Sequence, residues 1–324
     1  MSTNKPRFFF TATQSVSDRI GELFSFTWAS YAGLRELWWQ ARGFSAQFPA
    51  LSIKDVEAKF LSVPKMPGGV DMKKMILDRD WMHHEREFSK SLIFGGCTLY
   101  ESWAESVCRD IFNATAAAKH SKSIQFPVNH NKPQPNGFKA VVAAANANKS
   151  ALIKANIFPT VKAASSNCWS TANEHLVAYR YFKECRNAMI HSSGLVNSEV
   201  LSAHQQLQNL HGINPSPFRH GFTIPAPQLG KPIPLDLRDA TLFATVVRRL
   251  IQTFDAALCV SSASESILNS KVKAVCATSS KWKTFPADPE NYRKRVHRLL
   301  SASMIPDPVN IDQVAAWLKG KGTI

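Results

Sequence analysis

The chain has 324 residues, of which 44% are hydrophobic and 19% charged, and this composition excludes a wholly disordered or collagen-like protein. The length suffices for one large domain or two small ones with a buried core. No apolar run approaches the roughly 18 to 20 residues that span a bilayer, and the apolar run at residues 8–10 is too short for the core of a signal peptide. We therefore expect a soluble protein without a membrane partner.

Positive charge is the most informative feature of the composition. Lysine and arginine number 39 against 24 aspartate and glutamate residues, which gives a net charge of +15. Residues 111–173 contain no acidic residue at all, yet they contain seven lysines, namely Lys119, Lys122, Lys132, Lys139, Lys149, Lys154 and Lys162. A continuous positive surface attracts the phosphates of a nucleic acid, so we expect such a partner, the alternative being a basic surface that binds nothing in particular.

The six cysteines form no C-x-x-C pair, and their spacing resembles neither a zinc site nor a small disulfide framework. Most of them lie among apolar neighbours in helical segments, where a free cysteine behaves as a small core residue. We expect a reducing, cytoplasmic compartment and neither a metal nor another cofactor.

The first third of the chain predicts long helices. After a loose arm up to Thr13, apolar residues recur at steps of three and four over residues 15–47, which indicates an amphipathic helix. Prolines and glycines at residues 64–69 break the chain, and we assign residues 1–69 to an N-terminal helical region. Residues 71–118 predict either two helices or one helix with a bend at Gly95 and Gly96.

The rest of the chain predicts a loop at 121–137, a short alanine-rich helix at 138–158 and a clearer helix at 166–193 that Gly194 ends. Prolines exclude a helix from the segment around 215–234, where residues 222–224 and 233–235 suggest a small β-hairpin. Asp236 caps a helix to residue 260, and a serine-rich linker leads into a basic tail at 261–324. The predicted fold is mainly α.

The end of the helix at 166–193 carries the only constellation of chemically active residues. At about 100° per residue, one face presents a core stripe of Ala178, Phe182, Cys185 and Met189, and the opposite face presents Arg180, Glu184, Asn187 and His191. Arg186 lies about 140° from His191 on an ideal helix. The two meet only if the last turn unwinds near residues 192–194, or if a partner chain completes the site.

This arrangement resembles a known family. Arg186 and Asn187, followed by His191 and Gly194, are similar to the Arg-x4–6-His motif of HEPN domains (higher eukaryotes and prokaryotes nucleotide-binding). The order of elements is also similar, because Glu101 lies in an apolar helical run that precedes a basic segment and the motif helix. The resemblance covers residues 70–260 and implies an antiparallel helical bundle, outside which lie the N-terminal region and the basic tail.

Many members of that family are metal-independent endoribonucleases of prokaryotic toxin–antitoxin and antiphage systems, in which the 2′-OH of the RNA attacks the adjacent phosphorus. The resemblance implies that His191 accepts the proton and Arg186 stabilises the phosphorane, with Asn187 and Glu101 in supporting roles. It also implies a homodimer and an antitoxin or defence-system partner. We expect RNA to be bound by Lys132, Lys139, Lys149, Lys154, Lys162 and Arg180. Two alternatives remain, a HEPN-like module that binds nucleic acid or a partner without cutting and a purely structural helical protein.

Overall fold

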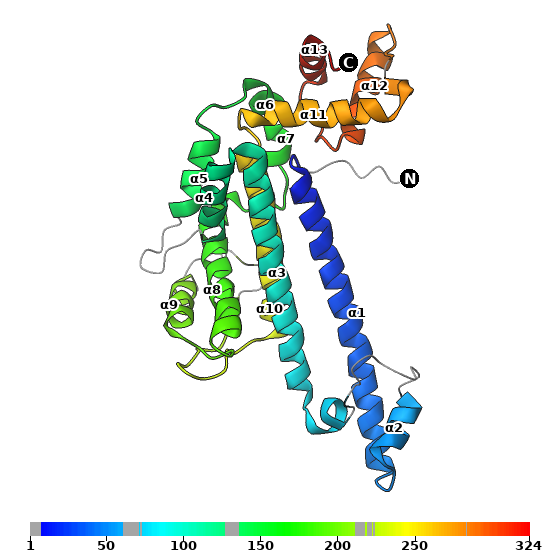
Figure 1. Ribbon diagram of the computed structural model, residues 1–324, viewed down its shortest axis with the longest axis vertical. Helices are drawn as coiled ribbons and strands as arrows, with labels where there is room; N and C mark the ends of the chain where they lie inside the picture. Colours follow the sequence, from blue (N-terminus) through cyan, green and yellow to red (C-terminus); the bar gives the residue numbers. More distant parts are fainter. Residues whose placement is uncertain are drawn as a thin grey trace.

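The computed structural model describes residues 8–60, 71, 73–126, 136–210, 218, 222, 224–282 and 284–324 (Figure 1). The longer α-helices are α1 (Thr11–Gln47), α3 (Trp81–Ile111), α4 (Ala114–Gln125), α5 (Asn136–Ala145), α8 (Ala172–His191), α9 (Ser198–Gln208), α10 (Leu237–Leu258), α11 (Ala263–Thr278), α12 (Pro289–Ala302) and α13 (Ile311–Gly320). The shorter elements are α2 (Ile53–Phe60), α6 (Ala151–Asn156), α7 (Phe158–Lys162), a π-helical turn η1 (Lys73–Asp78) and the 3₁₀ turns η2 (Trp169–Thr171) and η3 (Ser280–Trp282). A mainly α fold is confirmed, since the described part of the chain contains no β-strand.

Four long helices, α1, α3, α8 and α10, lie lengthwise beside one another (Figure 1). Side-chain pairs define their directions: Trp103 of α3 bonds to Thr13 near the start of α1, whereas Glu85 near the start of α3 bonds to Tyr31. The helices α1 and α3 are therefore antiparallel. The described helices do not include one that is long and apolar enough to cross a bilayer.

Helix α10 is the centre of the core, and most of its residues are buried. The predicted cap is confirmed, because the Asp236 carboxylate accepts a hydrogen bond from the Arg238 amide at the first turn. Its rings pack on both neighbours, Phe243 against Phe182 of α8 and Phe254 against Trp103 of α3. Helix α10 thus joins α3 to α8.

The N-terminal end of α1 is anchored in this core. Residues 8–10 are buried, although the sequence predicts a loose arm there; residues 1–7 lie outside the described part. The amides of Phe9 and Phe10 donate to the two carboxylate oxygens of the buried Asp255 (2.8 and 3.0 Å), and Lys271 of α11 donates to the Phe9 carbonyl (2.6 Å). Apolar burial and satisfied backbone groups together explain why this segment is ordered.

Other boundaries also differ from the predictions. Helix α3 runs unbroken through Gly95 and Gly96, where the lack of a side chain lets Leu23 and Phe243 pack closely, so no bend forms. Helix α4 occupies the first part of the expected loop at 121–137, and residues 127–135 are not described. The expected serine-rich linker is helical from Ala263 onwards, and Ser264 within it is buried.

The expected hairpin of residues 222–224 and 233–235 is not found among the described residues, and Thr223 lies outside them. Instead, the amide of Ile233 donates to the Gly194 carbonyl (3.0 Å), and Pro232 forms an isolated bridge with Leu195. Two further backbone bonds join the segments, from the Val196 amide to the Lys231 carbonyl (2.9 Å) and from the Gly230 amide to the Val196 carbonyl (2.9 Å). Pro232 has no N–H to donate, which interrupts the pairing. The segment therefore packs against the end of α8.

The main hydrophobic cluster runs from Phe9 to Leu318 and includes buried residues of α11, α12 and α13. The region expected as a basic tail is thus folded helices that share one core with the rest of the chain. A second, small cluster of Trp38, Ala41, Val56 and Ile76 closes the far end of α1 against α2 and η1.

Candidate functional site

Helix α8 positions the motif residues and ends as its sequence predicts. It remains helical through His191, after which Ser192 leaves the helical conformation (φ −122°, ψ 28°). Gly194 follows with a φ of +75°, a conformation that glycine adopts without strain, and its amide donates to the Ala188 carbonyl (3.1 Å). His191 is therefore the last helical residue.

Glu101 of α3 binds the cationic side of α8. Its carboxylate forms an ion pair with the Lys183 ammonium through Oε1, and Oε2 lies 3.5 Å from the Nη2 atom of Arg186. The structure thus brings Glu101 and Arg186 together, as the sequence suggests, and adds Lys183, which sequence reasoning missed. Lys183 lies one helical turn before Arg186, and this i, i+3 spacing places the two cations on the same side of α8. That spacing was the sequence signal that Lys183 belongs to the same site as Arg186.

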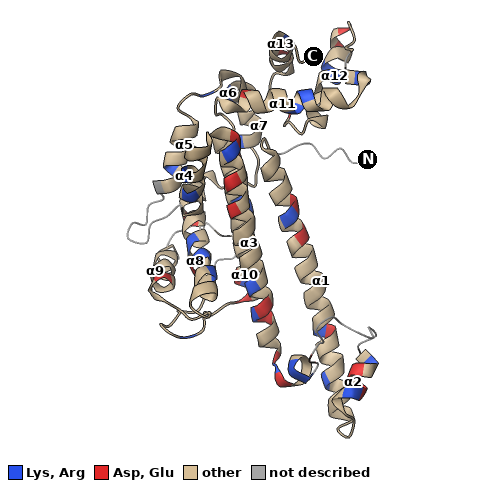
Figure 2. Cartoon of the chain, in the orientation of Figure 1, with Lys and Arg blue, Asp and Glu red and all other residues tan. Residues whose placement is uncertain are grey.

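Asn187 and Glu184 extend the cluster along α8. Arg186 Nη1 donates to Asn187 Oδ1 (3.2 Å), and Asn187 Nδ2 donates to Glu184 Oε2 (3.4 Å). The second carboxylate oxygen of Glu184 pairs with Arg180 Nη2 at 2.5 Å. The ion cluster therefore comprises Glu101 of α3 and Arg180, Lys183, Glu184, Arg186 and Asn187 of α8. Figure 2 shows basic and acidic residues along α8.

Most of this ion cluster is buried, although the sequence predicts a solvent-facing polar side. Arg180, Lys183 and Glu184 are all buried. Arg180 and Lys183 also lie over the ring of Phe126 at the end of α4, at 5.2 and 4.8 Å from its centroid. Burial lowers the pKa of the Arg180 guanidinium and of the Lys183 ammonium, because desolvation disfavours the charged form. Arg180, expected to bind nucleic acid, is instead an internal partner of Glu184.

Arg186 differs from the other cations of the ion cluster because 21% of its side chain is exposed. Three cations face two carboxylates in the cluster, which leaves one positive charge in excess. The Nε atom of Arg186 is buried and has no hydrogen-bond partner among the described residues. A guanidinium carries five N–H donors, so Arg186 retains donors for an oxyanion.

His191 stands apart from the ion cluster. Its side chain is exposed, and no hydrogen bond or ion pair joins it to another described residue. Because α8 is regular through His191, the rotation of about 140° between Arg186 and His191 persists, with a rise of about 7.5 Å. Within one chain these two side chains do not converge on a single point.

The expected RNA-binding lysines are distributed along another side. Lys139 is exposed on α5, and Lys132 lies outside the described residues. Lys149 and Lys154 line a cavity of about 190 Å³ together with Phe158 and Trp169, and Lys162 lies over the Phe158 ring at 5.6 Å. The sequence analysis did not single out Phe158 or Trp169 as functional. The available signal was that these two aromatic residues flank Lys162 within the acid-free part of the chain.

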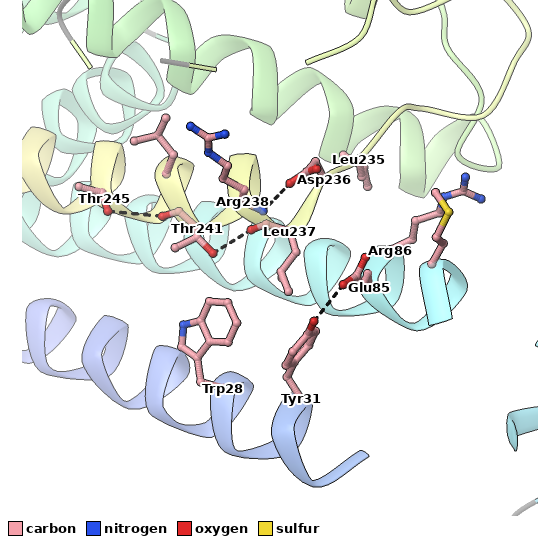
Figure 3. Close-up of a pocket in the computed structure, with 12 residues that line it drawn as sticks. Trp28, Tyr31, Glu85, Arg86, Leu235, Asp236, Leu237, Arg238, Thr241 and Thr245 are labelled. Carbon is pink, nitrogen blue, oxygen red and sulfur yellow. Dashed lines mark hydrogen bonds between the residues drawn. The ribbon is translucent and has the colours of Figure 1, made fainter. Parts of the chain in front are cut away.

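A cavity of about 530 Å³ lies elsewhere, between α1, α3 and the start of α10 (Figure 3). Trp28 and Tyr31 form one wall, and Leu237 and Thr241 lie opposite. Glu85 is occupied by the Tyr31 hydroxyl (2.9 Å), and the other carboxylate in this cavity caps α10. No residue expected to be functional lines this cavity, and none of its carboxylates is left without a partner.

The described residues contain no group of three or more His, Cys, Asp or Glu side chains arranged to hold a metal ion. Five of the six cysteines are buried and all are free, as their sequence context predicts. Burial raises the pKa of the Cys97 and Cys185 thiols to about 12, so both are uncharged core residues, Cys97 on α3 and Cys185 on α8.

The chain matches no protein-family model, no curated protein and no solved structure.

Proposed function

We propose that this protein is a metal-independent endoribonuclease of the HEPN type that cleaves RNA with Arg186 and His191. The observation that supports this function best is the support around Arg186. Glu101 and Asn187 hold its terminal nitrogens, its Nε atom has no partner among the described residues, and an exposed histidine ends the same helix. We place its natural role among toxins or effectors of prokaryotic antiphage defence, with an antitoxin or another defence protein as partner.

The reaction needs a base, an acid and a cation. The 2′-oxygen forms a bond to phosphorus while His191 accepts its proton, and the bond from phosphorus to the 5′-oxygen breaks as that oxygen gains a proton. The products are a 2′,3′-cyclic phosphate and a 5′-hydroxyl end. The guanidinium of Arg186 stabilises the extra negative charge of the phosphorane, and its fixed position avoids reorganisation during the step.

Two copies of the chain are required in this scheme. Arg186 and His191 of one chain diverge by about 140°, so the complete site combines side chains of two α8 ends, and a second His191 serves as the acid. Ile190 and Leu195 on either side of the helix end are exposed, as is Leu229 in the neighbouring segment. Exposed apolar side chains next to an incomplete site favour a homodimer that buries them.

The test is cleavage of end-labelled total RNA in the presence of EDTA. We expect the wild type to cut and His191→Ala to lose cutting while keeping its fold and RNA affinity. His297→Ala, which removes an exposed histidine of α12 paired with Asp307, is the matched control and should cut like the wild type. Cutting by the His191→Ala protein at the wild-type rate would refute the proposed catalytic role.

A second candidate function is a HEPN-like module that binds RNA without cutting it. The cavity with Lys149 and Lys154 favours it, because this basic and aromatic site includes neither His191 nor any residue of the ion cluster. This alternative predicts salt-dependent RNA binding without cleavage. Charge reversal at Lys139, Lys149 and Lys154 would then weaken binding strongly, and His191→Ala would leave it unchanged.

A further inference from the structure

The cavity between α5, α6, α7 and the end of α10 has the composition of a site for a single nucleotide. Its volume is about 190 Å³, and its lining residues are Val142, Asn146, Lys149, Lys154, Phe158, Trp169, Ala257 and Val260. The lining combines two aromatic residues and two lysines with three apolar side chains, Val142, Ala257 and Val260. The lining contains no carboxylate.

The walls of this cavity are fixed by hydrogen bonds to the core. Trp169 Nε1 donates to the Lys162 carbonyl (3.2 Å), and the amide of the preceding Cys168 donates to the buried Thr253 hydroxyl of α10 (2.9 Å). On the other wall, Asn146 Nδ2 donates to the Ala257 carbonyl (3.3 Å). These bonds hold the Trp169 ring and the turn before α6 in place.

Trp169 nonetheless keeps 39% of its surface exposed. A large aromatic side chain that is held rigidly and still faces solvent is typical of a stacking surface, because every base offers a π-face to it. Lys149 and Lys154 at the same cavity supply charges for the adjoining phosphates. The nearby Glu265 accepts a hydrogen bond from the Ser150 hydroxyl (2.6 Å), and among the described residues it forms no ion pair with Lys149 or Lys154.

We propose that this cavity binds one unpaired nucleotide of single-stranded RNA, with its base stacked on Trp169 and its phosphates on Lys149 and Lys154. The choice of RNA as the ligand rests on the proposed function, whereas the nucleotide pocket itself rests on the cavity. A base within a duplex is covered on both faces, so a stacking site of this kind selects unpaired segments.

The pocket and the proposed catalytic end of α8 are far apart. Trp169 precedes Arg186 by 17 residues, which is about 25 Å along a helix, and a stacked strand spans that length in about 7 nucleotides. Helix α5 leads away from the pocket to α4, since Asn146 after its end lines the pocket and Gly137 at its start lies against Ser123 of α4. Lys139 is exposed on this helix. The pocket therefore holds the RNA at a distance from the cleavage point.

The test is fluorescence anisotropy of a labelled, unstructured 12-nucleotide RNA at several salt concentrations. We expect Trp169→Ala to weaken binding by about 5- to 150-fold, the usual effect of losing one aromatic–base stack, and Trp169→Phe to restore most of the affinity. Trp39→Ala, at an exposed tryptophan of α1, is the matched control. Lys149→Gln and Lys154→Gln should each reduce the slope of log affinity against log salt by about 0.7.

Further measurements separate this proposal from the nuclease. A 4-nucleotide single-stranded RNA should bind Trp169→Ala more weakly than wild type, because one unpaired nucleotide is enough to fill the pocket. A blunt RNA duplex should bind both proteins alike, because its bases are covered. Equal binding of the 12-nucleotide RNA to Trp169→Ala and wild type, with unchanged far-ultraviolet circular dichroism, would overturn the pocket. Trp169-dependent binding without cleavage by the wild type would instead retain the pocket and refute the nuclease. An acidic peptide that displaces the RNA with equal potency from wild type and from Trp169→Ala would show charge attraction alone and would also overturn it.

Discussion

Removing the charge of Glu101 tests the buried ion cluster most directly. Glu101→Gln keeps the volume of the side chain but leaves the Lys183 ammonium, which is 3% exposed, without its anion. Breaking a buried ion pair by removing one partner typically costs about 3–5 kcal/mol. Because Glu101 itself keeps 20% of its side chain exposed, we expect the lower end of that range, about 3 kcal/mol of unfolding free energy.

The assay is urea unfolding followed by circular dichroism, with the slope against urea concentration checked for constancy. Glu87→Gln on the same helix is the matched control, since its partner Lys90 is exposed and such surface pairs contribute at most about 1 kcal/mol. Adding Lys183→Met to Glu101→Gln removes the stranded charge and should recover most of the loss. The reasoning is refuted if Glu101→Gln costs no more than Glu87→Gln, or if the double variant loses the sum of both single effects.

Three further predictions follow from the geometry. Burial raises the pKa of Asp255 to about 6, so between about pH 4 and 6 the folded state holds a proton that the unfolded state has released. The free energy of unfolding should therefore fall by about 3 kcal/mol as the pH rises from about 4 to 6. Thermal unfolding of Asp255→Asn should show a flatter pH profile than that of the wild type. Gly194→Ala forces a side chain into a positive φ and should cost about 1–2 kcal/mol in chemical unfolding, whereas Gly33→Ala in the open middle of α1 should stabilise by about 0.5–1 kcal/mol. Ile190→Glu should shift the sedimenting species from dimer to monomer and abolish RNA cleavage, whereas the control Phe26→Glu on α1 should do neither. A wild type that sediments as a monomer while it cuts RNA would contradict the dimeric site.

Local patterns predict the helices that carry their own signals. The steps of four between buried residues and the Asp236 cap define α10 without reference to any other element. Gly194 predicts the end of α8 because the left-handed backbone there, which Ser193 shares (φ +53°), is a local feature. The mainly α fold class and the burial of the cysteines are predictable for the same reason, because both follow from the apolar pattern of each segment alone.

Features that depend on distant partners were not predictable. The polar side of α8 resembles a solvated face in sequence, but Glu101 of α3 and Phe126 of α4 cover it, and no periodicity within α8 reports that contact. The segment around Phe9 looks like a flexible arm until Asp255, more than 240 residues later, is known to accept its amides. Of the proposed site, the motif residues were found from the sequence, whereas Trp169 required the cavity to be seen.

The link between Phe9 and Asp255 bears on how the chain is made. The two residues are separated by 246 positions, and Lys271, which binds the Phe9 carbonyl, is synthesised later still. At about 5–20 residues per second, the first helix waits on the order of 12–50 s on the ribosome before its anchor exists. During that time residues 8–10 lack the carboxylate and the ammonium that hold their backbone groups, so the nascent chain should be a substrate for chaperones that bind aromatic segments. A C-terminal truncation before Asp255 should therefore yield an aggregating protein rather than a shorter folded one.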